Sequence, residues 1–105
     1  MSNQAAGLIE VYGLVAAFAA CDAGCKAANV TVETFDKNKP GNADKLEVPL
    51  IVLIKFRGSV ENVTAAVEAA EAEANRLTGV VSKHIIANVT EGADKMMKLN
   101  AFDKK

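Results

Sequence analysis

Residues 6–30, AGLIEVYGLVAAFAACDAGCKAANV, decide the fold of this chain. The apolar run from Leu8 to Tyr12 predicts a strand, and Gly13 separates it from a stretch with a different period. From position 14 to position 28, apolar and small residues return every three or four positions, which predicts a helix. The residues expected on its buried face are Leu14, Ala17, Phe18, Cys21, Cys25 and Ala28. Alternation over residues 30–35 then predicts a second strand.

The rest of the chain repeats this order of elements. Residues 36–49 hold both prolines, and Pro40-Gly41-Asn42 is typical of a turn, so an exposed loop is expected there. The unbroken apolar run 50–56 predicts a strand that is covered on both faces. Ser59 is a candidate N-cap for a helix over residues 60–77, which Thr78-Gly79 would end. The expected buried stripe of this helix is Val60, Val63, Val67, Ala70, Ala74 and Leu77. Residues 80–87 predict a last strand, and the tail from Thr90 to Lys105 suits a short amphipathic helix around Met96, Met97 and Leu99.

This order predicts an α+β fold of the ferredoxin-like βαββαβ type. Two right-handed crossovers would place both main helices on one face of a four-stranded antiparallel sheet, with a short C-terminal helix added. The length of 105 residues suits one domain, which we expect over residues 5–98 with a flexible tail at 99–105. Half of the residues are hydrophobic but only 5% are aromatic, so the core must depend on close approach of backbones. Such a domain gains burial by self-association, and an oligomer is expected.

Composition argues against several classes of partner. The formal charge is −1, and no basic run precedes Lys104-Lys105, so neither nucleic acid nor an acidic membrane is expected to bind. The apolar segments are too short to cross a bilayer, and the first residues lack the pattern of a secretion signal. A cytoplasmic protein is expected.

The sequence shows no recognisable catalytic or cofactor-binding motif. His84 is the only histidine and lies on a predicted strand, where we interpret it as structural. Cys21 and Cys25 are four residues apart in a predicted helix, which suits neither a loop-closing disulfide nor a Cys-x-x-Cys metal knuckle. We interpret them as small core hydrophobes; the alternative is a metal or iron–sulfur site completed by symmetry-related chains. The sequence therefore predicts no enzyme activity and no cofactor.

Several fixed positions nevertheless match a known family. They are Gly7-Leu8-Ile9-Glu10, Gly13, Asp22-Ala23, Lys26-Ala27-Ala28-Asn29-Val30, Phe56-Arg57-Gly58-Ser59-Val60, and Gly79-Val80-Val81-Ser82 with His84. In these residues the chain resembles the bacterial microcompartment shell-protein domain of the hexamer-forming, single-domain kind. The resemblance implies a ferredoxin-like variant whose six copies close into a ring, and rings that tile into a shell around enzymes.

The resemblance also implies a pore on the sixfold axis, lined by the loop after the second strand. In this chain that place holds Lys37, Asn38, Lys39, Pro40, Gly41 and Asn42. The family's segment is shorter and rich in glycine, so we expect an altered or narrowed pore for small metabolites.

A third implication concerns contacts at the hexamer edge, which fall on Lys26, Asn29 and Asn88. Asn88 stands where the family carries an arginine, and an amide cannot supply the donors of a guanidinium. We therefore expect a hexamer that tiles weakly alone and mixes with other shell proteins, with encapsulated enzymes as further partners. Two other functions stay open: a ferredoxin-like ligand-sensing regulatory oligomer, expected as a trimer, and a shell protein that carries metal at the two cysteines.

Overall fold

The computed structural model describes residues 4–38 and 50–99, in which four strands and three helices form. They follow in the order β1 (Ala5–Tyr12), α1 (Leu14–Ala27), β2 (Thr31–Asn38), β3 (Ile51–Gly58), α2 (Val60–Leu77), β4 (Val80–Ile86) and α3 (Glu91–Met97). The strands pair in the order β2-β3-β1-β4, and every neighbouring pair is antiparallel. The predicted α+β, ferredoxin-like arrangement is confirmed.

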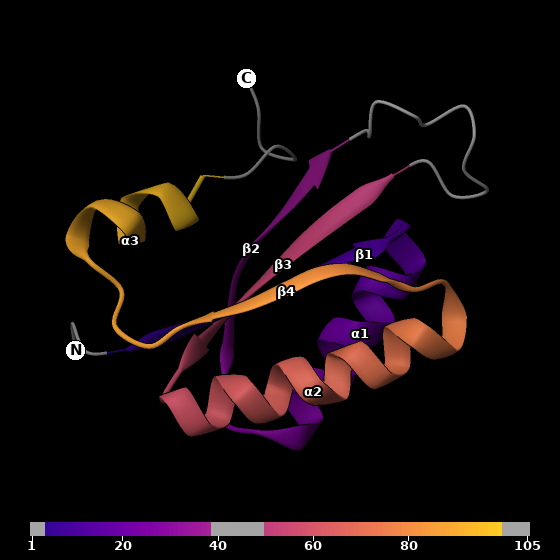
Figure 1. Ribbon diagram of the computed structural model, residues 1–105, viewed down its shortest axis with the longest axis horizontal. Helices are drawn as coiled ribbons and strands as arrows, with labels where there is room; N and C mark the ends of the chain where they lie inside the picture. Colours follow the sequence, from indigo (N-terminus) through magenta and orange to yellow (C-terminus); the bar gives the residue numbers. More distant parts are fainter. Residues whose placement is uncertain (1–3, 39–49, 100–105) are drawn as a thin grey trace.

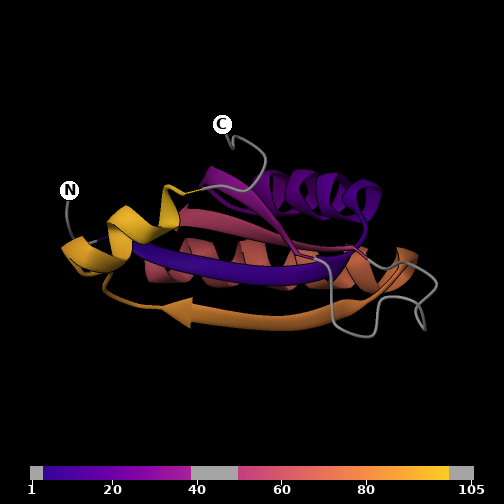
Figure 2. The same cartoon turned by 90° about the horizontal axis from the view of Figure 1, so that it is seen from above.

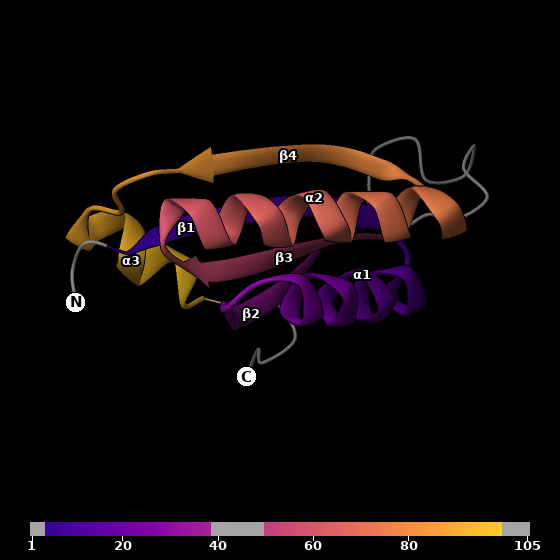
Figure 3. The same cartoon turned by 90° about the horizontal axis from the view of Figure 1, so that it is seen from below.

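The molecule has three layers (Figure 1). Helices α1 and α2 lie side by side across one face of the sheet, which Figure 3 shows from the helical side. Helix α3 lies against the opposite face, near the end of the sheet where β1 begins, as Figure 2 shows. Among the described residues, no helix is long and apolar enough to span a membrane.

Glycine and capping residues lie at the helix boundaries that the sequence predicts. Gly13 has a φ of 91°, which lets the chain turn sharply from β1 into α1. The Ser59 side chain accepts a hydrogen bond of 3.1 Å from the backbone N–H of Asn62 and caps α2. Gly79, with a φ of 132°, donates its N–H to the Ala74 carbonyl at the other end of that helix.

The core lies between the sheet and the two long helices. Ile9 and Val11 of β1, with Val52, Ile54 and Phe56 of β3, are fully buried there. The helices meet them with small residues, which are Ala16, Ala17, Ala20 and Gly24 of α1 and Ala66, Ala70 and Ala74 of α2. A Cβ added at Gly24 would lie 2.6 Å from the Phe56 ring and 3.0 Å from the Ala66 carbonyl oxygen. Small side chains therefore set how closely the helices and the sheet approach, as the composition predicts.

The predicted buried face of α1 is wrong for its larger residues. Ala17 is buried, but the side chain of Phe18 is 58% exposed and Leu14 and Cys25 are exposed too. Helix α1 is apolar on nearly every side, so its period does not single out one face. Close packing decides instead, because only the alanine and glycine side lets α1 approach α2 and Phe56.

Two further predictions need correction at their limits. The central residues of the α2 stripe are buried, from Val63 to Ala74, but Val60 and Leu77 at its ends are exposed. Strand β2 extends to Asn38, pairing with β3 as far as Ile51, so the segment after β2 begins later than we expect from sequence. The division into a domain over 5–98 and a tail over 99–105 stays a prediction: Leu99 is described, and residues 100–105 lie outside the described residues.

Candidate functional site

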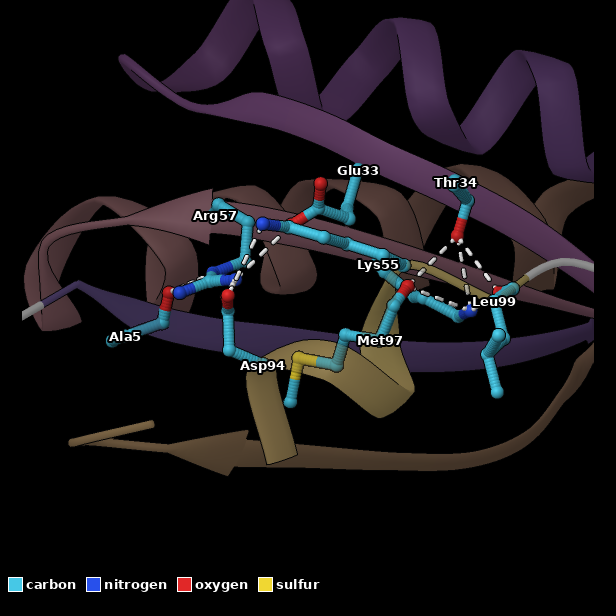
Figure 4. Close-up of polar contacts among 9 residues, drawn as sticks. Ala5, Glu33, Thr34, Lys55, Arg57, Asp94, Met97 and Leu99 are labelled. Carbon is cyan, nitrogen blue, oxygen red and sulfur yellow. Dashed lines mark hydrogen bonds and ion pairs between the residues drawn. The ribbon is translucent and has the colours of Figure 1, made fainter. Parts of the chain in front are cut away.

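Two cations on β3 attach α3 to the open face of the sheet (Figure 4). Lys55 and Arg57 are two positions apart in the strand and therefore point to the same face, away from α1 and α2. Only 3% of Lys55 and 8% of Arg57 is exposed, although both are charged residues in an otherwise apolar strand. Buried cations require partners, and α3 with β2 provides them.

Lys55 binds the end of α3. Its Nζ donates to the carbonyl oxygens of Met97 at 3.1 Å and Leu99 at 2.6 Å, and to the Thr34 hydroxyl at 3.0 Å. An ion pair to Asp36 is longer, at 4.0 Å. Burial lowers the pKa of Lys55, while the carboxylates of Asp36 and Glu33 oppose that shift. The ammonium, together with the Thr34 hydroxyl that donates to the Met97 carbonyl at 3.0 Å, therefore satisfies carbonyl groups at the end of the short helix.

Arg57 connects three segments. Its guanidinium donates to Asp94 of α3 at 2.6 Å, to Glu33 of β2 at 3.1 Å and to the Ala5 carbonyl at 3.3 Å. The hydrogen bond from Arg57, with one from Lys98, lowers the pKa of Asp94. A groove of about 540 Å³ beside this cluster is lined by Arg57, Glu33, Asp94 and Lys98, among others. Its charged groups are largely paired with one another, so the cluster is built to hold α3 in place.

This cluster is not among the sites predicted from sequence. Its signal was present, because Lys55 and Arg57 are cations at alternate positions of an apolar run. The apolar run 50–56 predicts a strand covered on both faces, and the buried side chains of Lys55 and Arg57 account for part of the face turned away from α1 and α2. Beyond α3, Ile51 and Leu53 on the same face are only partly buried.

The predicted pore segment falls mostly outside the described residues. Lys37 and Asn38 belong to β2, where they pair with Val52 and Ile51, and are not in a loop as we expect from sequence. Lys39, Pro40, Gly41 and Asn42 lie outside the described residues. The pore itself stays a prediction.

The predicted edge residues lie at one end of the sheet but not together. Lys26, in the last turn of α1, forms an exposed ion pair of 2.8 Å with Asp22, and that hydrogen bond raises the pKa of Lys26. Asn29 precedes β2 and Asn88 follows β4, and these strands form opposite edges of the sheet. Both asparagines are exposed. Within one protomer the three residues therefore form no single site.

The cysteines and the histidine lie near the surface. Cys21 is partly buried and Cys25 is exposed, so the prediction that both are core residues is wrong for Cys25. Burial, with the neighbouring Cys25 thiol, raises the pKa of Cys21 to about 11. His84 is exposed on β4. Over residues 4–38 and 50–99, no group of three or more histidine, cysteine or acidic side chains could hold a metal ion.

Comparison with known proteins identifies the family. The family model of the BMC domain matches residues 5–89. The chain is 32% identical to the bacterial microcompartment shell protein PduA of Citrobacter freundii over 97 residues, covering 92% of this chain and 95% of that protein. It is 35% identical over 97 residues to the carboxysome shell protein CcmK2 of Synechocystis sp., covering 90% of this chain and 85% of the relative.

A solved structure agrees with these relatives. The crystal structure of a microcompartment protein from Desulfitobacterium hafniense superposes with a TM-score of 0.70 at 25% identity, over 90% of this chain. This chain spans 47% of the length of that neighbour. Since the family model covers most of the chain and the relatives match along nearly their whole length, the chain belongs to the BMC-domain family.

Proposed function

We propose that this chain is a structural shell protein of a bacterial microcompartment, located in the shell inside the cytoplasm, and not an enzyme. The observation that carries the proposal is the match along nearly the full length of PduA and CcmK2, both of which are named as shell proteins. A shell protein needs surfaces for assembly rather than a reaction centre. The exposed apolar residues of this chain fit that need.

The ring proposal is supported by exposed apolar residues on two different sides of the protomer. On α1, Leu14, Val15 and Phe18 are exposed, and the Phe18 ring lies 5.2 Å from that of Phe35 on β2. On the side of α2 and β4, Val60 is exposed at the start of α2, and Leu77 and Val81 are exposed at and just beyond its other end, about 25 Å away along the helix. A cyclic ring joins one patch to a different patch on the next copy. We propose that six copies pair the exposed residues of α1 with the exposed residues beside α2 and β4 around the ring.

The pore and edge proposals follow from the ring. Residues 37–42 would then meet their symmetry copies at the axis, and six copies of a long segment would alter or narrow the opening. Lys26, Asn29 and Asn88 would lie on the perimeter of the ring. Because Asn88 lacks the fork of donors of an arginine, rings of this chain would tile weakly alone and join other shell proteins, with enzymes enclosed behind them.

Subunit count is the first test. Native mass measurement should give six copies; a stable monomer would overturn the ring, and three copies would favour a ligand-sensing oligomer. Phe18→Asp should break the ring, because it places a carboxylate within an apolar contact. Met96→Asp is the matched control, since Met96 is 68% exposed but lies on α3, across the sheet from α1.

Imaging tests the tiling. Electron micrographs of the protein alone should show few ordered sheets, and Asn88→Arg should increase them, whereas Asn88→Gln should not. Extended sheets from the unmodified protein would contradict the edge proposal while leaving the ring intact.

A further inference from the structure

Helix α1 carries two free thiols one turn apart. Cys21 and Cys25 occupy positions i and i+4, which lie on the same side of a helix with Cβ atoms about 5–6 Å apart. Cys25 is exposed and Cys21 is partly so, which makes the pair reachable from solvent in the protomer. Cys21 packs against the edge of the core, whereas Cys25 is exposed, so packing alone does not account for a second sulfur atom one turn away.

The surroundings of the pair limit what it can bind. Asp22 and Lys26 also lie on this part of the helix but are 2.8 Å from each other, so the carboxylate is already paired. Among the described residues, no group of three histidine, cysteine or acidic side chains that could hold a metal ion includes the two thiols. Zinc in structural sites takes four ligands, and iron–sulfur clusters take four cysteines. The two cysteines of one protomer are too few for either.

We propose that Cys21 and Cys25 together bind a single thiophilic, closed-shell monovalent cation, of which Cu(I) is the representative. Soft thiolates favour Cu(I), and this ion accepts two sulfur ligands without a third. Binding forms two metal–sulfur bonds and breaks two S–H bonds; both protons pass to solvent, and neither sulfur nor metal changes oxidation state. The bound site carries one negative charge.

Anaerobic titration with Cu(I) against a chromophoric chelator tests the proposal on the full chain. We expect one Cu(I) per protomer and two sulfur neighbours at the metal by X-ray absorption. Cys21→Ser and Cys25→Ser should each weaken binding by about a hundredfold or more, because chelation by two arms on one helix is lost. Circular dichroism and subunit count, measured on the same samples, show that fold and assembly are kept.

Two controls make the result decisive. Met96→Leu removes an exposed thioether on α3 and should leave the affinity unchanged. Zn(II) should bind far more weakly than Cu(I) to the unmodified protein. Three or four sulfur neighbours would mean that several copies share the ion, which would overturn the proposal. It would also be overturned if single-cysteine variants bound Cu(I) as tightly as the unmodified protein, because the two cysteines would then not form the site together.

Discussion

Replacing Lys55 by methionine tests whether this cation holds α3 on the sheet. The change keeps an unbranched side chain of similar length but removes the donor of three hydrogen bonds, at 2.6, 3.0 and 3.1 Å. Each hydrogen bond to a charged group contributes about 1.5–3 kcal/mol, while loss of the buried charge removes a desolvation cost of several kcal/mol. The Thr34 hydroxyl still donates to the Met97 carbonyl at 3.0 Å after the change, so the net loss reflects the lost charged hydrogen bonds and the weakened pairing of the Leu99 carbonyl, and we expect about 3 kcal/mol.

The loss should appear first in α3. Outside its polar contacts, α3 is held by a small apolar cluster of Ala6, Val89 and Met97, so it is the element that can open while the main core persists. Hydrogen exchange of the α3 amides should accelerate roughly a hundredfold, since each 1.4 kcal/mol is a factor of about ten. Urea unfolding of the same variant gives the total change in free energy.

Lys83→Met is the matched control. Lys83 forms an ion pair of 2.7 Å with Glu71, but its side chain is 48% exposed, and such surface pairs contribute less than about 1 kcal/mol. If both methionine variants lose the same small amount of stability, or if exchange in α3 is unchanged in Lys55→Met, the reasoning is refuted.

Three other predictions concern packing, the exposed ring and acid stability. Phe18→Ala should lower the unfolding free energy of the dissociated protomer by only about 1 kcal/mol, the contribution of its aromatic pair; a loss of 3 kcal/mol or more in urea would place the ring in the core. Gly24→Ala should destabilise the fold by about 1–3 kcal/mol, because the added Cβ meets the Phe56 ring and the Ala66 carbonyl oxygen. Gly92→Ala is the control: nothing lies within 4 Å of its added Cβ, so it should be neutral or stabilise by up to about 1 kcal/mol. Thermal unfolding measures both changes. The pKa of Asp94 is lowered in the folded protein, so this carboxylate contributes stability above its ordinary pKa of 3.8, and that stability is lost as the pH falls toward its lower pKa in the folded state. Asp94→Asn should therefore flatten the dependence of the unfolding free energy on pH in that range. An unchanged acid profile would contradict this.

The sequence determined the order and type of the elements. The switch of period at Gly13, the cap at Ser59 and the glycine after Thr78 are local signals, because backbone conformation at those positions depends on few neighbours. The family was also readable from sequence, since its motif is a fixed series of residues between positions 7 and 30.

Only the tertiary structure decided which side of α1 is buried. The helix is apolar almost all round, so the choice depends on the space that Phe56 and α2 leave, and that space admits Gly24 but not a larger residue. It likewise decided that Lys55 and Arg57 are buried, because their partners come from β2, α3 and the start of β1, far along the chain. The local sequence pattern determines where helices, strands and turns form. Which side chains are buried depends instead on segments far apart in the chain, whose shapes must fit each other.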